Sequence, residues 1–277
     1  MRIAKYLVSF FVLLSVIGVR AVSAAPESEQ QVEEQPGTIS GKILIKGDGP
    51  LAWGEIMLYS AAAGLPPRPE KYDRTPDFTR VIDSEGFFRI TVPPGTYYLG
   101  AVKRMTGDRV GTPQVGDYSL LQVDDKGKLK EYVVKAGASL DVGSITEARK
   151  LEPKDFVRRG RTTGITGQIT DAEGNPVQNA FVLAYINPEM RGKPLFISAR
   201  SDKNGRYLLR LAPGNYFLRA RSEVTSGPPE PGDIVGYYGE GTPEAVVVKD
   251  GVVQDGVNFI VILFGGRGPQ PGRLAPQ

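Results

Sequence analysis

Residues 202–218, DKNGRYLLRLAPGNYFL, decide how this 277-residue chain folds. Residues 207–211 place apolar side chains at every second position, a period that is typical of a β-strand with one buried face. The turn Asp202–Gly205 precedes this strand, and Pro213-Gly214 leads into a second apolar segment, Tyr216–Leu218. Because aspartate can hydrogen-bond the backbone of a tight turn and glycine can take a positive φ, the stretch predicts strands joined by short turns.

The same pattern occurs earlier in the chain, at residues 83–99, as DSEGFFRITVPPGTYYL. Two further pairs of segments match in the same order: TISGKI at 38–43 with GITGQI at 164–169, and YVVKAG at 132–137 with VVVKDG at 246–251. The offset between the copies falls from 126 to 114 residues, so only the loops differ in length. The repeat predicts a duplicated domain.

The repeat and the composition of its flanks predict the domain organisation. No convincing amphipathic helix of three turns follows the first 24 residues, and Gly- and Pro-containing turns recur at short intervals. We therefore expect an all-β chain with two tandem Greek-key β-sandwiches of seven strands each. The predicted boundaries are a signal peptide at 1–24, a flexible acidic lead-in at 25–36, the first sandwich at 37–147, a basic linker at 148–163, the second sandwich at 164–264 and a disordered tail at 265–277.

The first residues have the layout of a secretory signal peptide. Two positive charges, Arg2 and Lys5, precede the apolar run Tyr6–Val19, and the small-residue stretch Ala21–Ala25 follows. An uncleaved anchor is the alternative, but the run is shorter than the ~20 apolar residues that span a bilayer comfortably. We expect cleavage between Ala24 and Ala25, no transmembrane segment in the mature chain, and a periplasmic, secreted or cell-surface location.

Charge and composition exclude several classes of function. Without Arg2, Lys5 and Arg20 the chain has 31 basic and 31 acidic residues, so no global positive field attracts nucleic acid. The absence of cysteine excludes a lipoprotein anchor and disulfides, which suits a bacterial envelope protein stabilised by its core. The absence of histidine removes the usual general base and the usual transition-metal ligand.

Four motifs carry a resemblance to a known family: GQITD at 167–171, GNPVQNA at 174–180, DKNGRY at 202–207 and APGNY at 212–216. Together they resemble the carboxypeptidase regulatory-like domain, and residues 237–251 resemble the far end of the same module. The resemblance implies a transthyretin-like (prealbumin-like) β-sandwich, which follows some metallocarboxypeptidases and is found in bacterial envelope proteins. Residues 37–146 match more weakly, with an insertion at 61–80. The family implies a fold and no particular function.

Exposed aromatic residues are the candidates for ligand binding. Tyr237 and Tyr238, flanked by glycines, form the best pair for stacking on a carbohydrate, and Tyr72 and Phe78 in the insertion come second. The alternative is that these rings cap the open end of each sandwich. We expect Trp53, the single tryptophan, to lie in the core, because it occupies an inward position of a predicted strand.

Acidic residues offer two weaker possibilities. Glu70, Asp73 and Asp77 crowd the insertion, but a glycosidase needs two acids held across a cleft, which short-turned sandwiches rarely provide. Asp83, Asp202, Asn204 and the pair Asp124-Asp125 could offer oxygens to calcium, although their place in turns explains them fully. The sequence therefore predicts no catalytic residue, no metal site and no cofactor.

A possible covalent cross-link and the basic linker complete the set of candidate features. A Lys–Asn isopeptide cross-link is not expected, because the first sandwich has no asparagine, and the second has Asn258 in its last predicted strand but no lysine in its first, residues 164–170. The basic linker could touch an acidic partner or a membrane surface, but a solvated linker is the ordinary interpretation. We therefore expect a non-enzymatic envelope scaffold or protein-binding module whose partner is an envelope or surface protein. A polysaccharide-binding protein is the alternative.

Overall fold

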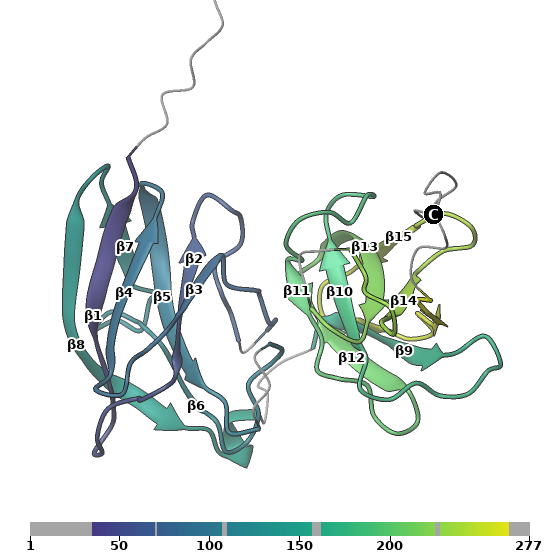
Figure 1. The fold of residues 1–277 in the computed structure, drawn as a ribbon, viewed down its shortest axis with the longest axis horizontal. Coiled ribbons are helices and arrows are strands. Elements are labelled where there is room, and N and C mark those ends of the chain that lie inside the picture. Colours follow the sequence, from purple (N-terminus) through teal and green to yellow (C-terminus); the bar gives the residue numbers. More distant parts are fainter. Residues whose placement is uncertain (1–34, 70, 107–109, 157–161, 225–227, 266–277) are drawn as a thin grey trace, which may run out of the picture. The chain divides into compact units, whose positions relative to one another are not determined.

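The computed structural model describes residues 35–69, 71–106, 110–156, 162–224 and 228–265. The predicted signal peptide, and nearly all of the predicted lead-in and tail, lie outside these ranges. The described chain is all-β and its strands form sandwich-like sheets, as the sequence predicts (Figure 1). A single turn of 3-10 helix at Pro153–Phe156 lies in the described part of the predicted linker.

The first sandwich contains strands β1 to β8. Strand β1 pairs with β4 on one side and with β8 on the other, which forms one layer. Strand β5 pairs with β2, β6 and β7, and β2 pairs with the edge strand β3, which forms the other layer. The bounds are β1 Gly37–Ile45, β2 Glu55–Ser60, β3 Phe78–Val81, β4 Phe87–Val92, β5 Gly95–Lys103, β6 Tyr118–Leu121, β7 Glu131–Val134 and β8 Ser139–Lys150.

The second sandwich repeats this pairing in the same order. Strand β9 pairs with β12, while β13 pairs with β10, β14 and β15, and β10 pairs with β11. The bounds are β9 Gly164–Thr170, β10 Phe181–Tyr185, β11 Phe196–Ile197, β12 Arg206–Arg210, β13 Gly214–Arg221, β14 Ile234–Tyr237, β15 Ala245–Val248, β16 Val253–Gln254, β17 Phe259–Ile260 and β18 Ile262–Leu263. Strands β9 to β15 therefore correspond to β1 to β7.

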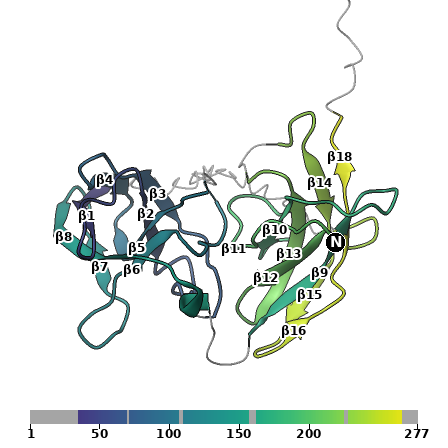
Figure 2. The ribbon, with the colours of Figure 1, turned by 90° about the horizontal axis from the view of Figure 1, so that it is seen from below.

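The two sandwiches differ in the strands that follow β7 and β15. Each has more than the seven strands that the sequence predicts. Strand β8 is continuous over 12 residues, runs parallel to β1 with two register shifts, and then pairs with β6. In the second sandwich β16 and β17 run parallel to β9, and β18 pairs with β14, which it accompanies in Figure 2. Gly256, with a φ of 82°, lies between β16 and β17, so the extended backbone is interrupted there.

Each sandwich encloses an apolar core formed by the alternating side chains of its strands. Phe88, Ile90 and Val92 of β4 are buried between exposed neighbours, and in β12 the buried Tyr207 and Leu209 alternate with the exposed Arg206 and Leu208, before the buried Arg210. The period-two pattern of the sequence is confirmed at both places. Other buried members are Ile39, Ile43, Ile56, Leu58 and Leu99 in the first core, and Ile165, Ile169, Val182, Leu218 and Phe259 in the second.

The aspartates of the predicted turns hold the backbone as expected. Oδ1 of Asp202 accepts hydrogen bonds from the backbone N–H groups of Asn204 and Arg206, at 2.8 and 2.9 Å. Asp83 makes the same pair of bonds in the first sandwich. Gly205, the last residue of the turn before β12, has a φ of 72°, which explains why glycine occupies it.

Two expectations need correction. Trp53 is 69% exposed and does not lie in the core, because its φ of 61° places it in a turn before β2 instead of in the strand. Strand β8 continues to Lys150, so it includes the first three residues assigned to the linker. Arg149 at its end pairs with Ser119 of β6 and donates two hydrogen bonds to Asp155, at 2.7 and 2.8 Å. Residues 157–161 of the linker lie outside the described ranges.

Candidate functional site

The candidate site lies beside two strands that are buried on both faces. Strand β10 has five consecutive buried residues, and β2 has four, Ile56–Tyr59. Their inward side chains belong to the two cores. Their outward side chains form separate apolar clusters: Met57, Tyr59 and Val102 on the first sandwich, and Phe181, Leu183, Tyr185, Met190 and Ile197 on the second. A strand covered on both faces is unusual for an antiparallel sandwich, in which one face is commonly solvated.

The connection from β2 to β3, residues 61–77, reaches the second sandwich, and we call it the strap. Tyr72 of the strap is only 6% exposed and belongs to the core cluster of the second sandwich. Its ring meets Phe196 of β11 edge-to-face at 5.6 Å between centroids, and Phe196 meets Tyr216 in the same way at 5.5 Å. The backbone N–H of Thr75 donates to the carbonyl of Leu195 at 2.9 Å. The strap therefore completes the core of the other sandwich.

A buried ion pair accompanies Tyr72. Asp73 of the strap binds the guanidinium of Arg210 on β12, which also donates to the backbone carbonyl of Pro69 at 3.1 Å. Burial raises the pKa of the Asp73 carboxyl above its usual value, and the neighbouring Arg210 charge opposes this rise. Two of the three carboxylates that crowd the insertion are therefore engaged by arginines, since Asp77 binds Arg74 at 2.6 Å. Glu70, the third, lies outside the described residues.

A cleft of about 510 Å³ opens beside the strap and is lined by the outward face of β2, by the strap, and by residues before and within β11. This volume lies within the range of small-ligand and peptide sites. Most of the wall is apolar: Met57, Tyr59, Pro67, Pro69, Pro76, Val110, Pro113, Leu121, Pro194, Ile197 and Val224. The charged side chains that line it are four cations, Arg68, Arg74, Arg104 and Lys193, and two carboxylates, Glu55 and Asp73, so the lining has a positive excess.

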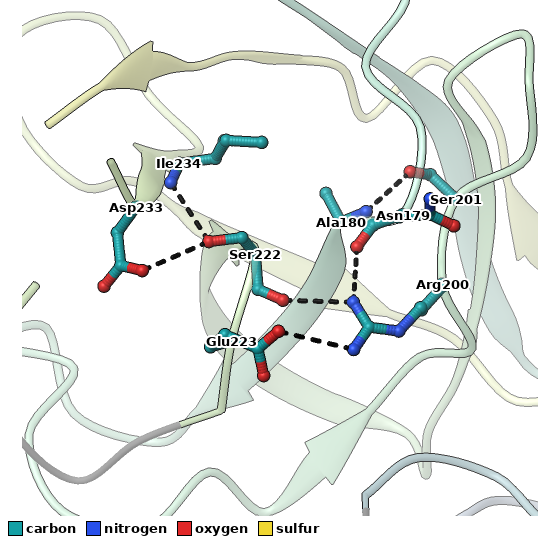
Figure 3. Close-up of polar contacts among 8 residues, drawn as sticks. All are labelled: Asn179, Ala180, Arg200, Ser201, Ser222, Glu223, Asp233 and Ile234. Atoms are coloured by element: carbon teal, nitrogen blue, oxygen red, sulfur yellow. Dashed lines mark hydrogen bonds and ion pairs between the residues drawn. The ribbon is translucent and has the colours of Figure 1, made fainter. Parts of the chain in front are cut away.

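A network around Arg200 holds the wall of the second sandwich beside this cleft (Figure 3). The guanidinium of Arg200 donates to the carbonyls of Asn179 and Ser222, at 2.7 and 3.1 Å, and lies 3.5 Å from the Glu223 carboxylate. It also stacks 4.2 Å from the centroid of the Phe181 ring. The network thereby fixes the end of β13, from which Val224 continues into the cleft wall.

The predicted aromatic residues occupy different environments. Tyr72 is buried, and its hydroxyl donates to the carbonyl of Pro66 at 2.9 Å, so its ring is not a platform open to solvent. Phe78 is half-buried and packs edge-to-face on Tyr97 at 5.9 Å, against the first core. Tyr238 is half-buried against Phe259. Of the four, Tyr237 is the most open, at 38% exposure.

Tyr237 and Tyr238 line a second concavity, a groove of about 480 Å³ at the end of the second sandwich. Amide and carboxylate side chains share the groove: Gln168, Asn258, Glu240 and Glu244. Asn258 accepts a hydrogen bond from the backbone N–H of Gln168 at 2.9 Å, and the Tyr237 hydroxyl donates to the carbonyl of Gly241 at 2.8 Å. The pair that the sequence singled out therefore borders a polar groove with one open ring.

The candidate calcium residues serve the backbone. Besides Asp83 and Asp202, Asp124 accepts hydrogen bonds from the backbone N–H groups of Lys126 and Lys128, both at 2.9 Å. Across the described ranges, no group of three acidic, histidine or cysteine side chains is arranged to hold a metal ion. In the same ranges, no helix has the length and apolar character to cross a bilayer.

Sequence reasoning missed the cleft, although one signal pointed to it. The segments Ile56–Tyr59 and Phe181–Tyr185 are apolar at successive positions instead of alternating, which is typical of strands covered on both faces. Arg74, Arg104 and Lys193 carry no such signal, because they come from three distant parts of the chain.

Comparisons with solved structures find similar chains at low identity. One is the Bacillus anthracis TIE protein, with 13% identity over 82% of this chain and 34% of that chain, and a TM-score of 0.26. A streptococcal ancillary pilin has 18% identity over 81% of this chain and 62% of that chain, with a TM-score of 0.21. The shaft pilin SpaA of Lactobacillus rhamnosus GG has 14% identity over 85% and 100%, with a TM-score of 0.22. The chain thus spans less than two thirds of the first two proteins.

Sequence comparison gives a family for part of the chain. No curated protein matches it. The family model of the carboxypeptidase regulatory-like domain matches residues 164–226, which form β9 to β13 of the second sandwich. This match confirms the family resemblance of the GQITD, GNPVQNA, DKNGRY and APGNY motifs for residues 164–226.

Proposed function

We propose that this chain is an exported, non-enzymatic interaction module of the bacterial envelope, and that a partner protein binds in the cleft beside the strap. The observation that carries the proposal is the cleft itself, with mostly apolar walls and four cationic side chains. Apolar walls with a few placed polar groups are the usual composition of a binding site. The signal-like N-terminus and the lack of cysteine support an exported protein of the envelope.

Non-enzymatic binding is supported by the chemistry of the side chains. The chain has neither histidine nor cysteine, and the strap carboxylates Asp73 and Asp77 are each paired with an arginine. We also propose that residues 37–150 are a second copy of the regulatory-like domain. The repeated motifs and the matching order of strand pairing support this duplication. In this proposal the two copies form a scaffold. The strap of the first copy packs on the second copy and lines the binding site.

A second candidate function, carbohydrate binding, is favoured by the groove at Tyr237 and Tyr238. An open tyrosine ring beside the side chains of Gln168, Asn258 and Glu244 combines a stacking surface with hydrogen-bonding groups. The groove has nearly equal polar and apolar character and no cation among its lining residues, unlike the cleft. We place it second because one ring of the pair, Tyr238, is engaged by Phe259.

Photo-crosslinking in the source bacterium tests the first function. A benzophenone amino acid replaces Thr79, an exposed residue of edge strand β3 that lines the cleft. The matched control carries the same group at Arg80, the next residue of β3, which does not line the cleft. A discrete protein adduct from position 79, absent from position 80, is the expected result.

The carbohydrate alternative is tested alongside, with the full chain on polysaccharide beads and with the Tyr237→Ala variant. Retention on a glycan that is lost in Tyr237→Ala, together with no adduct from position 79, would replace the first function by the second. Adducts of equal yield from positions 79 and 80 would show contact without a site in the cleft.

A further inference from the structure

Four buried polar atoms of the cleft residues lack a hydrogen-bond partner among the described residues. They are Nε and Nη1 of Arg74, Oγ1 of Thr75 and Nε of Arg104. Arg74 is only 5% exposed, and all three residues line the cleft. Buried polar groups in folded proteins are almost always hydrogen-bonded, and an exception calls for a specific reason such as a bound ligand. Their concentration around one cleft therefore points to a ligand at this place.

The chemistry of these atoms defines what they bind. Guanidinium nitrogens are donors only, and a threonine hydroxyl can also donate, so the complementary group is an acceptor with more than one oxygen. Asp77 at 2.6 Å offsets the charge of Arg74, and Glu55 at 3.5 Å offsets the charge of Arg104, so the positive charge in excess comes from other side chains. The exposed side chains of Arg68 and Lys193 add two positive charges to the lining. A carboxylate fits both the donors and the charge.

The walls define the rest of the ligand. Five prolines and several aliphatic side chains line the cleft, which suits aliphatic groups. Tyr59 offers no open face for stacking on a sugar, because it is 6% exposed and the guanidinium of Arg74 lies 5.6 Å from its ring centroid. The charge and the walls together favour a polypeptide that carries a carboxylate beside aliphatic side chains.

We propose that the cleft recognises an acidic peptide segment of the partner protein, with an Asp or Glu carboxylate directed at Arg74 and Arg104 and neighbouring Leu, Ile or Val side chains against the proline-rich wall. This inference rests on the proposed function and gives its partner a chemical class. Arg68 and Lys193, at the exposed rim, attract the segment and add to its affinity.

Selection from a random heptapeptide library on the full chain tests the proposal. The selected peptides are expected to carry Asp or Glu next to an aliphatic residue. In fluorescence polarisation, replacing that acid by its amide weakens binding about tenfold or more, the usual cost of losing a charged hydrogen bond. The protein variant Arg68→Glu/Lys193→Glu changes only exposed residues and weakens binding similarly. The matched control Lys126→Glu/Lys249→Glu, exposed residues that do not line the cleft, leaves binding unchanged.

A second pair of variants locates the binding. Thr79→Trp fills the cleft and is expected to abolish peptide binding, whereas Arg80→Trp has no effect. Selected peptides without acids, equal affinity for acid and amide peptides, or binding that survives Thr79→Trp would overturn the proposal. Tight binding of an oligogalacturonate, with no peptide selected, would assign the cleft to acidic sugars instead. If position 79 gives a protein adduct but the selected peptides show no preference for acidic residues, only this inference is overturned. If there is neither an adduct nor a preference for acidic peptides, the proposed function is overturned as well.

Discussion

The connections that follow β2 and β10 are equivalent in the two sandwiches but differ in what they contact. In the second sandwich residues 186–195 lead from β10 to β11 and carry Met190, which packs on the outer face of the same sandwich. In the first, the longer strap leads from β2 to β3 and contributes Tyr72 and Asp73 to the second sandwich. The same strand topology therefore allows the equivalent loop to pack on its own sandwich in one case and on the neighbouring sandwich in the other. The candidate site lies where the two sandwiches differ, in a connecting loop, which is where binding residues are generally found.

The largest expected effect comes from removing the strap residue that the second core uses. Tyr72→Ala deletes a buried aromatic ring that packs on Phe196, and it should lower the free energy of unfolding by about 3–5 kcal/mol. Trp53→Ala is the control, a still larger truncation but of an exposed ring, with an expected effect within about 0.5 kcal/mol. Urea unfolding followed by circular dichroism measures both. Equal losses from the two variants would show that the strap does not belong to the second core.

The loss of folding stability at alkaline pH should distinguish two equivalent tyrosines, Tyr216 and Tyr97. Burial raises the pKa of Tyr216 from 10.0 to about 12. Because this folded-state pKa is above that of the unfolded chain, the contribution of Tyr216 to stability is complete below pH 10 and is lost as the pH rises towards 12. The loss is on the order of 2–3 kcal/mol. Burial also raises the pKa of Tyr97, whose hydroxyl donates to the carbonyl of Pro93 at 2.7 Å.

Unfolding measured across this alkaline range, together with tyrosinate absorbance, checks the prediction. Tyr216→Phe removes the ionisable hydroxyl, so its stability should decline less between pH 10 and 12 than that of the wild type. Tyr97→Phe loses about 1 kcal/mol already at neutral pH through its hydrogen bond. If wild type and Tyr216→Phe lost stability in parallel, ionisation of Tyr216 would not be the cause.

Two equivalent glycines, Gly41 and Gly167, test how readily the last strands of the two sandwiches can shift. A Cβ on Gly167 of β9 would lie 2.1 Å from the backbone oxygen of Val257, whereas one on Gly41 of β1 would lie 2.7 Å from a methyl group of Val142 and 2.8 Å from the backbone oxygen of Gly143. Because the backbone clash is closer at Gly167, more of the neighbouring strand must move, so Gly167→Ala should cost about 2–3 kcal/mol and Gly41→Ala about 1–2 kcal/mol. Thermal melts of both variants test this order. A larger cost at Gly41 would mean that the continuous strand β8 is the stiffer neighbour.

Local patterns predicted most of the fold, and long-range contacts account for what they missed. The alternation in 87–92 and 206–210 and the aspartate turns depend on neighbouring residues, so the sequence revealed them. Tyr72 joins a core whose residues lie more than 90 positions further along the chain, and nothing near it announces that partner. The same holds for Asp73, which meets Arg210. The groove residues Tyr237 and Tyr238 were found because flanking glycines marked them, whereas the cleft joins segments without a shared motif.

The smallest expected effect concerns Trp53, where the alternation rule failed. Trp53, with a φ of 61°, is matched in the second sandwich by Asn179, with a φ of 65°. Each residue lies three positions after the proline that bridges back to the first strand of its sandwich, Pro50 and Pro176. Left-handed backbone costs an ordinary residue about 1–2 kcal/mol, and asparagine adopts it more readily.

Trp53→Asn should therefore stabilise the first sandwich, by about 0.5–1 kcal/mol, because the exposed ring contributes little packing to offset the strain. The reciprocal change, Asn179→Trp, should destabilise the second sandwich by a similar amount. Calorimetric melts of both variants measure the pair. A loss of stability in Trp53→Asn would mean that the tryptophan makes contacts worth more than its backbone strain, and the turn would then depend on the ring instead of on the left-handed residue that the two sandwiches share.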